Sequence, residues 1–347
     1  MIDWISGTFP FKHKNTVHDG AQVVLDAAGD VKFQRLVPRQ FVGSYEVGIR
    51  ISTDLLSEDD QGNYTKLRFD GNPTKLFQGH NLWGTDDVHG LLMETHSLLR
   101  SSIEGYIANQ LDLSLVSEGA IPLRRVDINE SFELPSLSDC LTWIRAAEHS
   151  TRLKHRGRGE MTGSTLYFGK KSTRWATKIY AKGQEIKDHP REKQPALVGL
   201  IQPQAWANRS LRVEHVIRGP ELKRRGLDLA GNWGDNTASE LHQELLQKLE
   251  FSEAMNVSPA ILDELPGSLR GAYALWKEGH DLRAVYSRPT FYRYRSKLLA
   301  YGVDIAIKQT STQTNVVPLV RILEAVPQGV PDWAYGTSLY FEPRRRA

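Results

Sequence analysis

The sequence predicts an α+β protein with a central antiparallel sheet, flanking helices and a mostly helical C-terminal part. Three observations predict it: strand-like alternation in the first two thirds, a pair of adjacent strands within residues 163–185, and helical patterns after about residue 221. Of the 347 residues, 40% are hydrophobic and 24% are charged, which allows two domains and a sizeable core. We place these domains at residues 1–220 and 221–347.

Each predicted element has its own local signal. Alternating or β-branched runs predict strands at residues 2–9, 41–52, 66–69, 122–132 and 208–218. Apolar residues at helical spacing predict helices at 86–110 and 136–149, the second with Ser136 or Ser138 as N-cap. Residues 151–161 are expected to form a basic loop and residues 187–194 a polar linker. Further helices are predicted at 240–249, 259–265, 268–277 and 288–301.

The hairpin at residues 163–185 carries the main candidate for chemistry. Its second strand places Tyr180 and Lys182 two residues apart, so a strand would project both side chains from one face. An ammonium beside a phenol favours the phenolate and lowers its pKa, which activates tyrosine as a nucleophile. The alternative is a packed tyrosine beside a solvated lysine.

Two other strands carry an acid two residues after an arginine. Asp127 follows Arg125 and Glu214 follows Arg212. Because a buried charge needs a partner, each pair indicates a buried ion pair or a metal site. Together the two carboxylates suit Mg²⁺ or Mn²⁺, which prefer oxygen ligands. In the glycine-bracketed loop at 75–85, His80 is either a metal ligand or a residue that caps a tight turn.

The predicted helix at 288–301 is strongly basic. Ser287 is a suitable N-cap, and Pro289 stands near the first helical position. The pattern is typical of the reading helix of a helix-turn-helix, which enters the major groove, although a basic surface helix is the alternative. The candidate DNA-binding residues are Arg288, Tyr292, Arg293, Arg295 and Lys297.

Other classes of chemistry lack their motifs. Cys140 is the one cysteine, so neither an internal disulfide nor a zinc site of the CxxC type is expected, and its apolar surroundings indicate a core position. The sequence has no G-x-S-x-G, Walker A or G-x-G-x-x-G motif. No signal peptide and no apolar run of membrane-spanning length is apparent. Clusters of lysine and arginine favour a polyanionic partner.

The chain resembles the gene II protein family, the replication initiators of filamentous phages. The resemblance spans nearly the whole chain in the family's order, and its Tyr-x-Lys-x-x-Glu pattern is also similar to plasmid rolling-circle initiators. The resembling segments are MIDW, KLFQGHNLWGT at 75–85, RRVDINESF at 124–132, IYAKGQE at 179–185, LRVEHVIR with KRRGL at 211–227, and NVVPLVRILE with PDW at 315–333.

This resemblance implies a metal-dependent endonuclease that starts rolling-circle replication. Tyr180 would attack a phosphate at the origin of the double-stranded replicative form, leave a 5′-phosphotyrosine and later rejoin the displaced strand, with support from Lys182. Asp127 and Glu214 match the acids expected at the metal. Glu185 matches the acid of the tyrosine motif, and we count it and His80 as further candidate metal ligands. The implied setting is the host bacterial cytoplasm, with host helicase and polymerase as partners.

Two other functions remain open from the sequence. A DNA-binding regulator would need the basic helix but not Tyr180. A tyrosine recombinase would need a tyrosine near its C-terminus, where Tyr340 stands within a basic tail.

Overall fold

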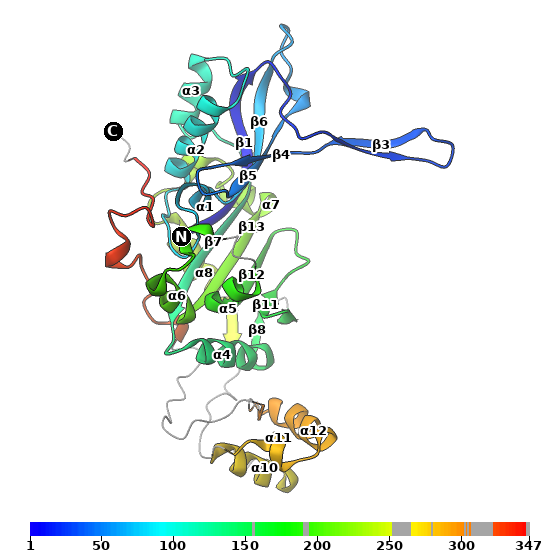
Figure 1. Ribbon diagram of the computed structural model, residues 1–347, viewed down its shortest axis with the longest axis vertical. Coiled ribbons are helices and arrows are strands. Elements are labelled where there is room, and N and C mark those ends of the chain that lie inside the picture. Colours follow the sequence, from blue (N-terminus) through cyan, green and yellow to red (C-terminus); the bar gives the residue numbers. More distant parts are fainter. Residues whose placement is uncertain are drawn as a thin grey trace.

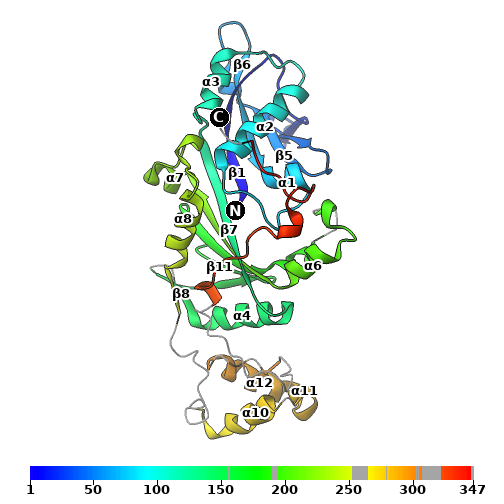
Figure 2. The ribbon, with the colours of Figure 1, turned by 90° about the vertical axis from the view of Figure 1, so that its left-hand side faces the viewer.

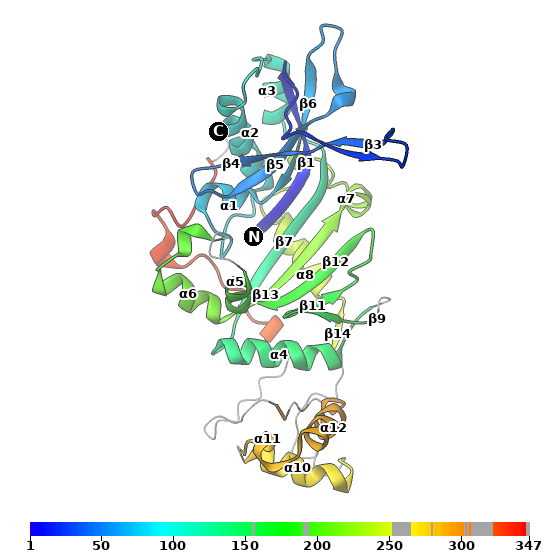
Figure 3. The ribbon, with the colours of Figure 1, turned by 45° about the vertical axis from the view of Figure 1, so that its right-hand side comes forward.

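The sheet predicted from the sequence is the centre of the fold. The computed structural model describes residues 1–154, 157–189, 194–251, 265–278, 280–301, 303, 305–306 and 322–344. Nine strands pair in the order β10-β11-β12-β13-β7-β1-β6-β5-β4, and the pairings between neighbours are antiparallel. Figure 3 shows β7, β13, β12 and β11 side by side. The α+β prediction with a central antiparallel sheet is therefore confirmed.

The strands of this sheet are β1 (Ile2–His13), β4 (Arg39–Val42), β5 (Gly48–Thr53), β6 (Tyr64–Gly71), β7 (Leu123–Glu133), β10 (Glu160–Thr162), β11 (Thr165–Phe168), β12 (Trp175–Ala181) and β13 (Ser210–Arg218). Two smaller sheets are formed by β2 (Ala21–Leu25) with β3 (Val31–Leu36), and by β8 (Thr151–Leu153), β9 (Gly157–Arg158) and β14 (Leu249–Phe251). The helices are α1 (Pro73–Gln78), α2 (Val88–Ser102), α3 (Gln110–Ser117), α4 (Leu137–Ser150), α5 (Lys182–Asp188), α6 (Ile201–Asn208), α7 (Gly219–Arg225), α8 (Thr237–Leu246), α10 (Gly267–Lys277), α11 (Leu282–Val285) and α12 (Arg288–Leu299).

One face of the sheet is covered by helices. The strand residues Val126, Ile128 and Ile217 belong to the main apolar core, as do Leu91 of α2 and Ile144 of α4. Helix α8 and the start of α7 bury their apolar side chains in the same core. Because side chains alternate along a strand, the neighbouring positions project from the opposite face. That opposite face carries the polar residues described below.

The structure differs from the predicted elements at several places. Residues 41–52 form the hairpin β4–β5 instead of one strand, and its turn includes Glu46, whose φ of 57° is left-handed. The helix predicted at 86–110 ends at Ser102, where Ile103 is extended. The expected basic loop at 151–161 contains short strands, whereas Ser136 is confirmed as the N-cap of α4. The hairpin β2–β3 had no sequence prediction; Figure 1 shows it projecting from the body, and its strand residues are mostly exposed.

The C-terminal part contains a separate helical unit. Helices α10, α11 and α12 enclose their own apolar core, which includes Leu269, Phe291 and Leu298 (Figure 1). The predicted helices at 268–277 and 288–301 correspond to α10 and α12, while α11 between them has only 4 residues. The helix predicted at 259–265 and the NVVPLVR segment lie outside the described residues, apart from Leu265.

After this unit, the chain returns to the sheet domain. Residues 322–344 pass beside α1 and α6 (Figure 2), where Trp333 packs against Trp83 and Phe341 stacks on Phe77. Apolar side chains between Leu222 and Leu249 also belong to the main core. The boundary at residue 220 stays a prediction. Among the described helices, none is long and apolar enough to cross a membrane.

Candidate active site

The polar face of the sheet contains a cavity of about 680 Å³. Strands β1, β5, β7, β12 and β13 form its floor, and the loop after α1 and helix α5 contribute to its walls. This volume is in the range of ordinary ligand sites. The lining side chains include Asp3, Trp4, Arg50, Asn72, Asn81, Arg125, Asp127, Tyr167, Lys178, Tyr180, Glu185 and Glu214.

Tyr180 lies in this cavity with its hydroxyl directed at a carboxylate. It stands near the end of β12, opposite Arg212 of β13, and Glu214 is two residues further along β13. The Tyr180 Oη donates a hydrogen bond of 3.0 Å to Glu214 Oε2. Burial, and then the negative charge of Glu214, raise the pKa of Tyr180 well above its ordinary value. The predicted lowering of this pKa by a lysine is therefore wrong, and the neighbouring carboxylate is placed to take the proton.

Asp127 and Glu214 face the same cavity and share a lysine. Lys178, directly opposite Glu214 in the sheet, places its Nζ 2.5 Å from Glu214 Oε1 and 3.9 Å from Asp127 Oδ2. The Nε of Arg125 donates to Asp127 Oδ1 at 2.7 Å, so the ion pair predicted for this strand is present. Sequence reasoning missed Lys178, although it stands two residues before Tyr180 on the same strand face.

The two carboxylates differ in protonation. Burial raises the pKa of Asp127 to about 7 and the charge of Glu214 adds to this, although the Arg125 hydrogen bond opposes it. Burial alone would raise the pKa of Glu214 as well, but Lys178 and hydrogen bonds hold it below its usual value. Glu214 is thus the ionised member of the pair near neutral pH, which suits a proton acceptor for Tyr180.

Lys182 and Glu185 lie on a helix and not on the tyrosine strand. Helix α5 begins at Lys182, so the predicted shared strand face is wrong; the helical i,i+3 spacing instead brings the two side chains together. The fully buried Nζ of Lys182 donates to Glu185 Oε2 and to Asn81 Oδ1, both at 2.9 Å, and lies 6.0 Å from the centre of the Tyr180 ring. Burial lowers the pKa of Lys182, whereas Lys182 lowers the pKa of Glu185 to about 2 against the effect of burial.

Asn81 connects the loop after α1 to the site. Its side chain accepts hydrogen bonds from Lys182 and from Gln194 and donates one of 2.8 Å to Asp3 Oδ1. Its backbone oxygen accepts a 2.5 Å hydrogen bond from Arg212 Nη1, and the backbone oxygen of Leu82 accepts another from the same guanidinium. Arg212 is fully buried and fixes the loop to β13. We did not predict Asn81 or Asp3 as site residues; both lie in segments that resemble the phage family.

His80 is fully buried beside the cavity but does not line it. The Nε2 of His80 lies 2.8 Å from the backbone oxygen of Leu339, and its Nδ1 lies 3.2 Å from the backbone nitrogen of Leu82. Burial lowers its pKa to about 4, so the ring is neutral at pH 7. With Nε2–H donating and Nδ1 accepting, neither nitrogen keeps a free lone pair. We therefore do not include His80 in the metal site considered below.

The carboxylates form a partial cation site. Among the described residues, no group of three or more histidine, cysteine or acidic side chains is placed to hold a metal ion. Mg²⁺ nevertheless binds proteins through one or two carboxylates, and substrate phosphates and water supply the other ligands. Asp127 and Glu214, which are neighbours on the adjacent strands β7 and β13, fit this type of site. Lys178 contacts both carboxylates, so an ion and this ammonium compete for the same oxygens.

The basic helix α12 is remote from this cavity in the fold. Its Phe291 and Leu298 are buried in the helical unit. Arg288, Tyr292, Arg293 and Lys297 are exposed, whereas Arg295 is half-buried. The exposed side is thus cationic, as a DNA-contacting helix requires, but whether these residues bind DNA stays a prediction.

The chain is similar to known phage replication proteins along most of its length. The N-terminal family description of the replication-associated gene II protein matches residues 1–236, and the corresponding C-terminal description matches residues 267–340. The replication-associated gene II protein of Enterobacteria phage I2-2 is 34% identical over 337 residues, which is 95% of each chain. A solved rolling-circle replication initiator from Geobacillus stearothermophilus covers 75% of this chain and 88% of its own at 14% identity and a TM-score of 0.33, too low to support an argument. On the family matches and the full-length relative, the chain belongs to the gene II family of phage replication-associated proteins, as its motifs indicated.

Proposed function

We propose that this protein nicks one strand of phage replicative-form DNA at the replication origin and later rejoins the displaced strand. The observation that carries the proposal is the 3.0 Å hydrogen bond from Tyr180 Oη to Glu214 Oε2 in an open cavity. A buried phenol held against an ionised carboxylate is an oxygen nucleophile with its general base in place. Family membership supplies the DNA substrate.

In the proposed cleavage step, Tyr180 Oη attacks the scissile phosphorus while its proton passes to Glu214. A bond forms between phosphorus and the tyrosine oxygen, and the bond from phosphorus to the 3′-oxygen breaks. The products are a 5′-phosphotyrosine and a strand whose 3′-oxygen takes a proton from solvent as it leaves and becomes a free hydroxyl. Rejoining is the reverse reaction: a 3′-hydroxyl attacks the phosphotyrosine and loses its proton to solvent, and Tyr180 recovers its proton from Glu214.

Cations in the cavity stabilise the charge that develops on the phosphate. Lys178 and Arg125 pair with the two carboxylates, and Lys182 lies beside the Tyr180 ring. Fixed positive groups in a buried site favour the crowded transition state more than they favour the ground state. Asp127 and Glu214 would hold Mg²⁺ or Mn²⁺, and such an ion polarises a phosphate oxygen when it is bound. Glu185 would act by holding Lys182.

The setting of this reaction follows from the proposed substrate. The partners would be the duplex origin and the displaced single strand, with host helicase and polymerase extending and unwinding the DNA in the host bacterial cytoplasm. Helix α12 would hold the duplex while the cavity acts on one strand.

A nicking assay tests the proposal. Supercoiled phage DNA is incubated with the protein in Mg²⁺, in Mn²⁺ and in EDTA, and the products are separated with and without protease. We expect open circles that carry covalently bound protein, only when a divalent ion is present. Binding of the origin without nicking under any of these conditions would favour a DNA-binding regulator.

A further inference from the structure

A row of arginines crosses the sheet, and two of its members, Arg50 and Arg125, line the cavity. Arg125 of β7 lies directly opposite Arg218 at the end of β13, and the backbone N–H of Arg218 donates to the oxygen of Arg174, just before β12. In the other direction, the register runs from Arg125 through β1 and β6 to Arg50 of β5. Residues directly opposite each other project from the same face of a sheet. We call Arg50, Arg125, Arg174 and Arg218 the arginine row.

Three members of the row are fixed by carboxylates but remain accessible. Arg50 pairs with Asp70, Arg125 with Asp127, and Arg174 with Glu221 at 2.7 Å. Their side chains are still 55%, 35% and 47% exposed. A guanidinium has five N–H donors, so one carboxylate leaves others for a second anion.

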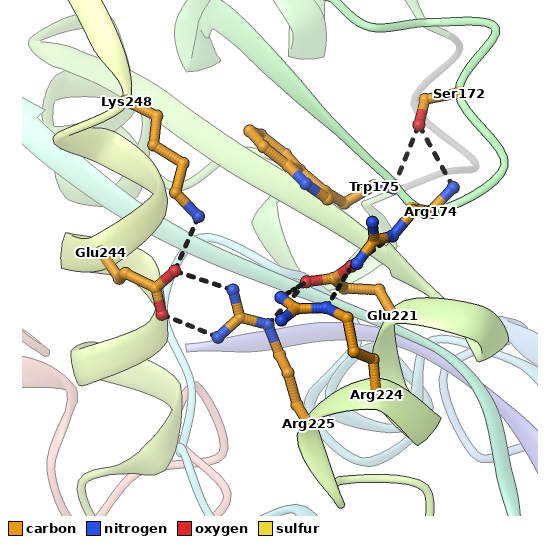
Figure 4. A network of polar contacts seen from close by, with 8 residues as sticks. All are labelled: Ser172, Arg174, Trp175, Glu221, Arg224, Arg225, Glu244 and Lys248. Carbon is orange, nitrogen blue, oxygen red and sulfur yellow. Dashed lines mark hydrogen bonds and ion pairs between the residues drawn. The ribbon is translucent and has the colours of Figure 1, made fainter. Parts of the chain in front are cut away.

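Glu221 strengthens this arrangement at one end of the row. Figure 4 shows Arg174, Arg224 and Arg225 converging on this buried carboxylate, and Arg225 also pairs with Glu244 at 2.7 Å. Lys248 contacts Glu244 at 2.6 Å. Four cations therefore surround two carboxylates where α7 and α8 meet the end of the sheet, and the guanidinium of Arg174 is held there.

Among the described residues, Arg218 has no carboxylate partner for its positive charge. In the described part of the chain, its guanidinium makes no hydrogen bond or ion pair, and its Nη1 is buried without an acceptor. Burial and the adjacent Arg125 lower its pKa. Arg218 is half-buried, and a buried N–H without an acceptor is costly, so a phosphate oxygen at Nη1 would remove that cost.

We propose that the arginine row binds backbone phosphates of the DNA strand on one side of the scissile phosphate. Arg174 precedes Tyr180 by six residues of extended chain, or about 20 Å at 3.3 Å per residue. That distance corresponds to at most about six nucleotides at the 3.4 Å rise of a stacked strand. The inference rests on the proposed nicking at Tyr180, because the arginine row lies on a defined side of the scissile phosphate only if that phosphate is cut at Tyr180.

The test uses three single-stranded origin oligonucleotides. One has ten nucleotides on both sides of the nick site, and the other two keep only two nucleotides on the 5′ side or on the 3′ side. We expect Arg218→Gln to lower kcat/KM about tenfold on the long substrate, since a hydrogen bond to a charged group contributes about that factor. The loss in kcat/KM should persist on the truncated substrate that keeps the flank bound by the arginine row, and it should disappear on the truncated substrate that lacks that flank. Arg218→Lys, which keeps the charge, should recover part of the loss.

Arg209→Gln is the matched control. Arg209 stands just before the opposite end of β13, pairs with Glu133 at 2.5 Å and is more exposed than Arg218. This variant should not reproduce the pattern of Arg218→Gln. An equal loss for Arg218→Gln on all three substrates, or no loss on any, would overturn the proposal.

A binding measurement separates this proposal from the nicking proposal. The affinity of the Tyr180→Phe protein for each oligonucleotide is measured as a function of salt, which needs no cleavage. Adding Arg218→Gln should reduce the salt slope by about 0.7 on the substrates that keep the relevant flank. If the protein never nicks DNA but shows this one-sided change in salt slope, the arginine-row proposal stands and only the nicking proposal fails.

Discussion

Tyr180 and Glu214 define the chemistry at the residue scale. Tyr180 is buried, and its pKa is raised by that burial and by the carboxylate that accepts its hydrogen bond. A free phenolate is therefore disfavoured at neutral pH, and in the proposed reaction the proton leaves as the tyrosine oxygen attacks. The proposed reaction differs in this from activation by an adjacent lysine, and we expect Glu214 to be as necessary to it as Tyr180.

Tyr180→Phe should abolish nicking and the covalent adduct while origin binding persists. Phenylalanine keeps the ring and removes only the attacking oxygen, and phosphate contacts from lysine and arginine supply most of the affinity for DNA. The measurement is an adduct gel together with a band-shift assay. Tyr167→Phe is the matched control, because Tyr167 lines the same cavity from the neighbouring strand β11. An adduct that survives Tyr180→Phe but is lost in Tyr167→Phe would move the nucleophile to β11.

Lys178→Gln should tighten Mn²⁺ binding by at least about tenfold, or about 1.4 kcal/mol. The lysine occupies the space between Asp127 and Glu214, so its removal leaves two carboxylates without their shared cation. Titration calorimetry of the DNA-free protein measures the effect. Lys170→Gln is the control, since Lys170 lies over the Tyr167 ring at the hairpin turn. Unchanged or weaker binding by Lys178→Gln would remove these carboxylates from the metal site.

At the element scale, the site depends on where β12 ends. The strand presents Lys178 and Tyr180 on the cavity face, and the chain then turns into α5 at Lys182. That turn buries Lys182 beside Asn81 and separates its side chain from the carboxylates of Asp127 on β7 and Glu214 on β13. Helix α12 is the second element with a proposed role, and it has its apolar side in the helical unit and its basic side exposed.

Arg293→Ala with Arg295→Ala should weaken origin binding but largely spare the nicking of a short single-stranded substrate. A good base contact contributes about 1–3 kcal/mol, and the short substrate would need only the cavity. Band shifts on duplex origin DNA and cleavage rates on the oligonucleotide give the two readings. Lys277→Ala, an exposed position on α10 of the same unit, is the control. An equal loss on both substrates would make α12 part of the catalytic fold.

At the scale of the whole molecule, buried histidines link folding to pH. His96 of α2 packs between Phe9 and Phe11, and burial, with a smaller effect of Arg100, lowers its pKa from 6.5 to about 4. Between these two values the unfolded chain binds a proton that the folded chain does not bind. The contribution of His96 to stability is therefore complete above about pH 6.5 and is lost as the pH falls toward 4.

The free energy of unfolding in urea should therefore fall between pH 7 and pH 4.5, and His96→Gln should reduce this dependence. His280→Gln is the control, because His280 is exposed and its replacement should leave the slope unchanged. A wild-type stability that is constant over this range would contradict the expected linkage.

Sequence patterns alone predicted the sheet strands around residues 123–133, 175–181 and 210–218, an N-cap of α4 at Ser136 or Ser138, and the family. These features depend on alternation, local capping and contiguous motifs, which are local properties of the chain. The sequence also indicated Tyr180 as a candidate nucleophile and Asp127 and Glu214 as candidate metal ligands, and all three line the cavity.

Which groups meet in space depends on the tertiary structure. Lys182 follows Tyr180 by two residues, but its side chain is directed by α5 and by contacts with Asn81, a hundred residues away in the sequence. Lys178 becomes the bridge between Asp127 and Glu214, and Arg218 joins Arg125 and Arg174, through the register of three strands. Register is set by long-range pairing and by burial of the opposite face of the sheet, and a local pattern does not contain that information.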